Sequence, residues 1–338
     1  MAQAERYGYT VARLRAMGHR LLDPGVFQRM LDAEDLQGAL KILNETCYAS
    51  WLVEMKGEGA FDEAIEAELR YVYREIEQFV PDKALVTLCK MPYDFHNIKV
   101  LLKSSFLQKS GGSRRWDLLT QLGNFTPEFL IEALESEDYR LLPYGLRTAI
   151  PHCLAQWEQS HDILEIERQL DDLLFTQMAA LAQTLDQKGA VHWVMGRIDA
   201  ENIRNLLRLR RTQVEVSRVA GFLHGGGIIS VERLIALLGE PLESWGRLLA
   251  YTDLTGALSG LQEVSDFDTL IVEVEKALDE YVLRVVEDAR FSSTAPENVL
   301  FYLWSKEMEA KNVRIILVGK ASGADRDVLR GLLRHVNG

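Results

Sequence analysis

The amino-acid sequence predicts an all-α fold. Apolar residues recur every three or four positions over long stretches, as on one face of a helix, and the 338-residue chain contains only 8 prolines. Sustained apolar–polar alternation is missing, and no Asn-Gly or Asp-Gly pair lies between two stretches of that kind, as it would in a β-hairpin. With 47% hydrophobic and 26% charged residues, the composition is that of a folded, water-soluble protein. The length favours two or three domains.

Three long amphipathic helices are predicted from this spacing. They cover residues 61–79, 163–185 and 270–285. Shorter leucine-rich stretches are expected to form pairs of helices, at 26–43, 127–150 and 231–251. The prolines are expected to separate helices, because proline lacks the backbone N–H and clashes with the preceding turn.

One short motif occurs three times along the chain, with the pattern acid-x-x-Asn-(Ile/Val)-(Lys/Arg)-x-(Leu/Ile)-Leu. Its acidic, asparagine and basic positions are Asp94, Asn97 and Lys99 in the first copy, Asp199, Asn202 and Arg204 in the second, and Glu309, Asn312 and Arg314 in the third. The asparagines are separated by 105 and then 110 residues. Repetition at such a period predicts three diverged copies of one helical unit.

The context of the motif repeats as well, which suggests how the chain divides. Each copy follows one of the long amphipathic helices and precedes a glycine-bearing break. We therefore predict three regions: 1–125, an N-terminal half-unit with the first repeat; 126–226, the second repeat; and 227–338, the third repeat. The opening stretch, 1–23, is expected to pack against the third copy and to help close a ring.

The chemistry of the motif allows two interpretations. An acidic residue after a turn is a natural N-cap, and an asparagine three positions later would then lie in the first turn of the helix. The motif is either a binding site shared by the copies or a helix-packing device that each copy inherited. We favour the packing device, because capping and packing account for every position.

The sequence carries no sign of catalysis, of a cofactor or of a metal. Phosphate-binding loops of the Gly-x-x-x-x-Gly-Lys-Ser/Thr type and Gly-x-Ser-x-Gly elbows do not occur, and the 7 histidines form no cluster. The 3 cysteines are far apart and form no Cys-x-x-Cys pair, which favours reduced thiols. A net charge of −12 argues against nucleic acid as a partner. The uncharged runs are too short for direct membrane insertion.

Two glycine-rich loops are the candidate sites of partner contact, because loops on a rigid helical frame commonly carry function. The alternative is that both are ordinary connections. Their residues are Gly111, Gly112, Arg114, Arg115 and Trp116 in the first loop, and Gly225, Gly226 and Gly227 in the second.

These features resemble the C subunits of the V/A-type (vacuolar-type) ATPases, the family of the eukaryotic V-ATPase d subunit. The resemblance rests on the three motif copies, on the opening stretch YGYTVARLRAM at 7–17 and on the run from Tyr302 to Arg314. Two positions depart from the repeat. The third copy has Glu309 in place of aspartate, and it has Val318 where the first two copies have Lys103 and Arg208.

The resemblance implies a non-catalytic rotor subunit. Three pseudo-symmetric helical repeats would form a funnel or socket that stands on the membrane proteolipid ring and receives the central-shaft subunits. It would transmit torque during ATP-coupled proton or sodium transport, in the cytoplasm, held at the inner face of the cell membrane by other subunits. The alternatives are an α-helical repeat scaffold that binds other proteins and an all-helical enzyme. A period near 105 residues disfavours the scaffold, and the enzyme lacks converging titratable groups.

Overall fold

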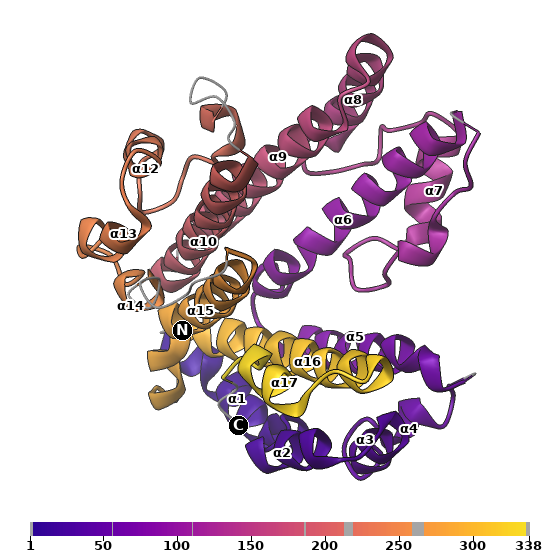
Figure 1. The fold of residues 1–338 in the computed structure, drawn as a ribbon, viewed down its shortest axis with the longest axis vertical. Helices are drawn as coiled ribbons and strands as arrows, with labels where there is room; N and C mark the ends of the chain where they lie inside the picture. The colour runs from indigo at the N-terminus through magenta and orange to yellow at the C-terminus, as the bar shows by residue number, and fades with distance from the viewer. Residues whose placement is uncertain are drawn as a thin grey trace. The chain divides into compact units, whose positions relative to one another are not determined.

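The computed structural model describes residues 3–55, 57–109, 111–185, 187–212, 219–258 and 267–335, and in these ranges its regular structure is entirely helical (Figure 1). The prediction of an all-α fold is confirmed. The N-terminal helices are α1 (Gln3–Ala16), η1 (Met17–Arg20), α2 (Pro24–Asp32), α3 (Leu36–Leu43), α4 (Ala49–Leu52) and α5 (Phe61–Phe79). The central helices are α6 (Ala84–Lys109), η3 (Trp116–Leu118), α7 (Pro127–Glu135), α8 (Leu146–Ser160), α9 (Ile163–Thr184) and α10 (Lys188–Thr212). The C-terminal helices are α12 (Val231–Leu237), α13 (Leu242–Leu248), α14 (Thr255–Leu258), α15 (Phe267–Glu287), η6 (Asp288–Phe291), α16 (Glu297–Ser322) and α17 (Arg326–Leu332).

The long amphipathic helices were predicted well, since α5, α9 and α15 occupy the expected stretches. The leucine-rich pairs are α2 with α3, α7 with α8, and α12 with α13, although α8 begins at Leu146 and ends well beyond the predicted limit. The first helix of each pair begins at a short polar residue. Asp23, Thr126 and Ser230 each accept a hydrogen bond from a backbone N–H in the following turn, as N-cap residues do.

Two prolines contradict the expectation that prolines separate helices. Pro92 lies inside α6, and Pro151 lies inside α8. The helices continue through them because both helices bury a face: Met91 and Phe95 flank Pro92 and are fully buried, as is Ile150 before Pro151. Burial of these side chains outweighs the backbone hydrogen bond that each proline removes.

The described chain forms two compact units, residues 1–86 with 236–338, and residues 87–235. In the first unit α16 packs along α5 and α15, and α1, α2 and α3 also contact α16 (Figure 1). The N-terminal helices therefore lie against the third motif helix, as expected for the opening stretch. Ring closure, the three-lobed arrangement and the boundaries of the three repeats stay predictions.

The second unit is organised around the antiparallel helices α9 and α10, with α8 packed on α9. Helix α6 meets α8 through the stacked rings of Phe106 and Trp157, whose centroids are 4.3 Å apart with an interplanar angle of 11°. Trp193, Phe95 and Ile203 are among the fully buried side chains of this unit. These contacts hold the first two motif helices in a rigid environment.

Candidate functional site

The three motif copies lie inside long helices and not at their N-termini. Asp94 belongs to the interior of α6, Asp199 to that of α10 and Glu309 to that of α16. The predicted N-cap role on the motif's own helix is therefore wrong. The helices begin earlier because the residues before each motif are apolar and buried, such as Leu88 before Asp94. All three acidic side chains and all three asparagines are buried, so their partners must come from other segments.

Each motif asparagine pairs with the backbone of one residue that lies 22 or 23 positions later. The Asn97 amide donates to the Thr120 carbonyl at 2.8 Å and accepts from the Thr120 N–H at 2.9 Å. Asn202 makes the same pair with His224, at 2.8 and 2.7 Å. A side-chain amide presents an NH2 donor group and a carbonyl acceptor side by side, so a single asparagine can satisfy both backbone groups of one residue.

The third asparagine makes this pair as well. Asn312 donates to the Arg334 carbonyl and accepts from the Arg334 N–H, both at 2.8 Å. This pair of hydrogen bonds between the motif asparagine and one backbone residue, called the asparagine tie below, is therefore common to all three copies.

The acidic residues of the first two copies hold the backbone just ahead of the next helix. Asp94 accepts from the Phe125 N–H at 3.0 Å and from the Asn124 amide at 2.7 Å. Asp199 accepts from the backbone N–H groups of Ile228 and Ile229, at 2.9 and 3.2 Å. Phe125 and Ile229 each lie two residues before the first residue of the following helix.

Glu309 also binds the backbone two residues before a helix, although that segment lies at the other end of the sequence. Its carboxylate accepts from the Leu22 N–H at 2.7 Å. Leu22 also lies two residues before the first residue of a helix, Pro24 of α2. The N-terminal helices thus occupy, in the third copy, the place that α7 and α12 occupy in the first two.

Glycine lets the shorter carboxylates approach the backbone. A Cβ on Gly123 would overlap Asp94 Oδ1, and a Cβ on Gly227 would overlap Asp199 Oδ1. The equivalent position in the third copy is Arg20, where the longer glutamate reaches Leu22 without such an approach. Gly227 was predicted as a partner-contact residue, and the structure gives it a role in the Asp199 tie.

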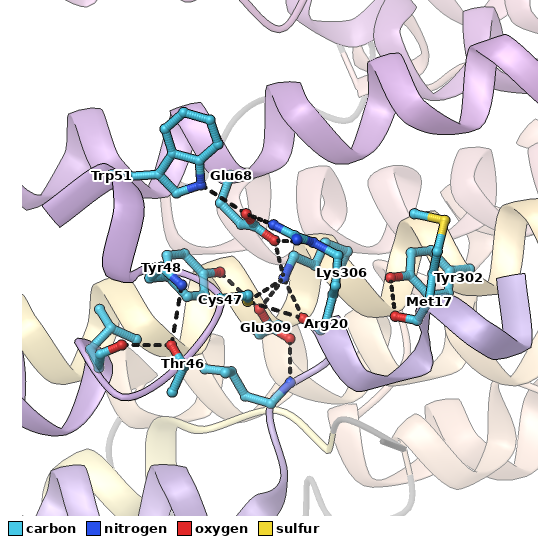
Figure 2. Close-up of polar contacts among 12 residues, drawn as sticks. Met17, Arg20, Thr46, Cys47, Tyr48, Trp51, Glu68, Tyr302, Lys306 and Glu309 are labelled. Carbon is cyan, nitrogen blue, oxygen red and sulfur yellow. Dashed lines mark hydrogen bonds and ion pairs between the residues drawn. The ribbon is translucent and has the colours of Figure 1, made fainter. Parts of the chain in front are cut away.

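Around Glu309 the third copy has a buried ionic cluster (Figure 2), whereas Asp94 and Asp199 make no ion pair with any residue that the structure describes. Lys306 Nζ lies 2.6 Å from Glu309 Oε1 and 3.1 Å from Glu68 Oε1, and it donates to the Arg20 carbonyl at 2.6 Å. The Arg20 guanidinium in turn binds both oxygens of Glu68. Two cations face two carboxylates, so the cluster is neutral overall. It joins η1, α5 and α16.

Neutral donors complete the cluster. The Tyr48 hydroxyl donates to Glu309 at 2.8 Å, and the Trp51 indole donates to Glu68 at 2.9 Å (Figure 2). Burial disfavours the ammonium of Lys306, but the carboxylates around it, Glu309 foremost, keep its pKa raised. The Cys47 thiol beside them has its pKa raised to about 12, mainly by burial, so it stays protonated.

The isolated aspartates of the first two copies behave differently. Burial raises the pKa of Asp94 to about 6 and that of Asp199 to about 7. The hydrogen bonds that each carboxylate accepts oppose this rise. Both groups therefore change protonation near neutral pH, far above the range of an exposed aspartate.

The basic motif residues make ion pairs with helices. Lys99 pairs with Asp171 on α9 at 2.7 Å, and Arg314 pairs with Asp62 on α5 at 2.6 Å. Arg204 pairs with Glu201 on its own helix at 3.1 Å. These pairs are partly exposed, so each contributes little to stability.

The first predicted loop is exposed from Gly111 to Trp116. Arg114 pairs with Glu135 at 2.6 Å and lies over the Trp116 ring, and Arg115 pairs with Asp117 at 2.8 Å. In the second loop Gly225 and Gly226 are exposed. Contact of either loop with a partner stays a prediction.

The comparisons with known proteins bear on the whole chain. The family model described as "ATP synthase (C/AC39) subunit" matches residues 10–332. The chain belongs to this family. The resemblance seen in the motif and in the terminal stretches is thereby confirmed.

The curated relatives have consistent names. The C subunit of the A-type ATP synthase of Methanocaldococcus jannaschii is 25% identical, with 97% of this chain and 86% of the relative covered. The C subunit of the V-type sodium ATPase of Enterococcus hirae is 24% identical over 96% of each chain. The C subunit of the A-type ATP synthase of Methanosarcina barkeri is 26% identical over 97% of this chain and 92% of the relative.

Membership makes the chain a non-catalytic subunit of an A/V-type rotary ATPase complex. In the described ranges, no three His, Cys, Asp or Glu side chains are arranged to hold a metal ion. None of the helices described for this C/AC39 subunit is long and apolar enough to cross a membrane.

Proposed function

We propose that this C/AC39 subunit is the rotor part that joins the central-shaft subunits to the membrane proteolipid ring. It transmits torque between them and so couples ATP turnover to proton or sodium transport. It works at the cytoplasmic face of the cell membrane, where the other subunits hold it. The observation that carries the proposal is the family match over nearly the whole chain.

The geometry of the repeats supports a torque-bearing role. A part that passes torque must resist shear between its helices. Here each motif helix is hydrogen-bonded at two points to neighbouring segments: its asparagine binds the segment that follows, and its acid binds the backbone ahead of another helix, which in the third copy is α2. The motif side chains that make these hydrogen bonds are buried, and buried polar groups whose hydrogen bonds are satisfied make a fold rigid. Three copies of one tied unit suit a socket that surrounds an axis.

The test uses the assembled complex in its own membranes. Inverted vesicles are prepared from cells with and without the gene for this chain, and ATP hydrolysis and ATP-driven ion uptake are measured on the same sample. We expect loss of the chain to abolish ion uptake while the catalytic part still hydrolyses ATP, and the wild-type gene to restore uptake. Unchanged ion uptake without the chain would overturn the proposal.

Gentle detergent extraction of the tagged protein tests the partners separately. We expect the proteolipid and the central-shaft subunits to co-purify with it. Co-purification of soluble proteins without the proteolipid would instead support the α-helical scaffold. Washing the bound complex with salt would then show which partner is held mainly by charges, because salt screens exposed charge pairs and releases that partner first.

A further inference from the structure

A pocket of about 250 Å³ opens in the second unit among the C-terminal end of α6, the η3 segment, α7 and α8. Leu101, Ile131, Leu134 and Leu154 give it apolar walls, and Trp116 and Tyr139 stand at its edge. The stacking of Phe106 on Trp157 fixes α6 against α8 beside it. The pocket is therefore preformed.

Its rim is charged, and most of the charges are already paired. Lys109 pairs with Glu158 at 3.5 Å, across from α6 to α8, and Arg114 pairs with Glu135 at 2.6 Å. Glu137 is the third carboxylate on the rim, and it makes no ion pair with the described cations. One negative charge is thus left over at the mouth of an apolar pocket.

The position of Glu137 is unfavourable in two ways that the unit itself does not offset. Its backbone has a φ of 55°, in the left-handed region that non-glycine residues seldom adopt. It also follows the C-terminus of α7, where the helix dipole disfavours an anion and favours a cation. Arg140 nearby is committed to Asp138 at 2.6 Å, and Arg147, which borders the adjoining hollow, does not reach Glu137.

We infer that this pocket receives an apolar side chain from a basic amphipathic helix of another subunit, with a lysine or arginine of that helix bound to Glu137. The volume fits an anchoring side chain and lies below the range of pockets that hold cofactors or drug-sized ligands. The free carboxylate and the helix C-terminus select a cation beside that side chain. Trp116 and Arg114, two of the predicted partner-contact residues, belong to this surface.

The inference requires only that the chain is a subunit of a complex, and not that it carries torque. Its occupant is a protein segment, because the walls are apolar while the free charge lies at the mouth. A small amphiphile that fills the pocket alone is the alternative outcome that the experiments distinguish.

The first experiment tests the recognition chemistry on the full chain. Methyl NMR of Ile131, Leu134 and Leu154 is recorded during titration with 2-phenylethylammonium and, separately, with 2-phenylethanol. We expect both to shift these methyl resonances, with the cation binding about two- to fivefold more tightly, as expected for an exposed ion pair. Glu137→Gln should remove that difference. Glu132→Gln, in α7 and not among the residues that line the pocket, should keep it.

Equal binding of the cation and the alcohol to the wild-type chain, or no shift of these methyls, would overturn the inference. Loss of the difference in Glu132→Gln would overturn it as well, because the selectivity would then reflect the general charge of α7. Folding of both variants is checked from the undisturbed methyl spectrum of the remaining residues.

The second experiment tests the occupant in the assembled complex. A photo-crosslinking p-benzoylphenylalanine replaces Tyr139, and a control chain carries it in place of Leu141, which is 79% exposed and does not line the pocket. We expect the probe at 139 to crosslink to an apolar residue of another subunit with a lysine or arginine within one helical turn. Crosslinking equal to that of the control, or only to lipid, would overturn a protein occupant. If the occupant inference fails but the proteolipid still co-purifies with the Glu137→Gln chain, only the pocket inference is overturned and the proposed rotor role stands.

Discussion

In all three motif copies the acid binds the backbone N–H two residues before a helix, but the first two copies and the third do so with different chemistry. Asp94 and Asp199 are short, approach the backbone over a glycine and accept their hydrogen bonds from neutral donors. Glu309 is longer, has no such glycine and lies in a neutral cluster with Lys306 and other charged groups. The third copy, which has the ionic cluster, is the one whose acid binds a segment from the other end of the sequence.

This difference shows what covalent continuity contributes. In the first two copies the bound segment lies about thirty residues after the motif acid, so closing the loop costs little entropy. In the third copy the tie joins residues 287 positions apart. The ionic cluster adds several directed contacts at this junction, and we expect it to favour this one arrangement even where its net stabilisation is small.

The largest expected effect comes from Lys306→Met, which removes the cation shared by Glu309 and Glu68. Breaking a buried ion pair by removal of one partner costs about 3–5 kcal/mol, because it leaves an uncompensated buried charge. The unfolding free energy is measured by urea denaturation at pH 7.5. Arg314→Met is the matched control on the same helix, since its pair with Asp62 is half-exposed and contributes less than about 1 kcal/mol.

Addition of Glu309→Gln to Lys306→Met sharpens this test. We expect the double variant to recover part of the loss of unfolding free energy, because it removes both charges of the Lys306–Glu309 pair and leaves no unpaired carboxylate at position 309. Equal small losses in Lys306→Met and Arg314→Met would show that the third copy does not depend on its cluster.

A smaller loss is expected from alanine at the motif asparagines, where the three copies are alike in geometry. Asn202→Ala leaves the N–H and C=O of His224 without partners in a buried place, which costs about 2–3 kcal/mol in unfolding free energy. Asn97→Ala should cost a similar amount. Asn312→Ala should cost less, since Arg334 is only half-buried and water can reach its backbone. Denaturation of the three variants in parallel checks this order, and equal losses in all three would contradict it.

The next largest loss of stability is expected at the glycines beside the motif aspartates, which the third copy does not have. Gly227→Ala places a Cβ against the Asp199 carboxylate, and overpacking of this kind costs about 1–3 kcal/mol. Gly225→Ala is the matched control two residues away, since nothing lies within 4 Å of its Cβ. Thermal unfolding compares the two variants, and a Gly225→Ala loss as large as that of Gly227→Ala would remove the role assigned to the close approach. Asp199→Ala in the Gly227→Ala background should relieve part of the loss.

The sequence predicts most of the fold and part of these ties. Helical spacing located α5, α9 and α15, because one apolar face is a strong local signal. The repeat identified the acid and the asparagine of each copy. It did not show that they lie inside helices, since an N-cap aspartate and a buried mid-helix aspartate differ only in tertiary partners. The partners Thr120, His224 and Arg334 contribute backbone atoms, which leave no sequence pattern.

The ionic cluster was missed for a related reason. Lys306 lies one helical turn before Glu309, which in an exposed helix would be an ordinary surface pair. Helix α16 is buried on several sides, so position alone did not distinguish an interior lysine from a solvated one. A lysine three positions before the acid in only one copy was the available signal.

The last expected effect is a pH dependence that comes from the aspartates of the first two copies. The pKa values of about 6 for Asp94 and about 7 for Asp199 lie above the value of about 3.9 in an unfolded chain. The folded protein therefore binds protons that the unfolded chain releases. Its unfolding free energy falls as pH rises from about 4 to about 8, through the folded pKa values of both groups, and has no further contribution from them above that range.

Between pH 6 and 7 this slope comes mainly from Asp199, and one group contributes at most about 1.4 kcal/mol per pH unit. Urea midpoints of the wild type and of Asp199→Asn at pH 5.5, 6.5 and 7.5 measure the difference in slope, and the ¹³C shift of the Asp199 carboxyl reports its titration directly. Parallel midpoints in the two chains would contradict the assignment. Lys306 stays charged throughout this window because its pKa is raised, so the cluster of the third copy adds no slope of its own through that residue. A slope between pH 6.5 and 7.5 that falls with Asp199→Asn but persists in Lys306→Met would therefore separate the isolated carboxylate of the second copy from the paired carboxylate of the third.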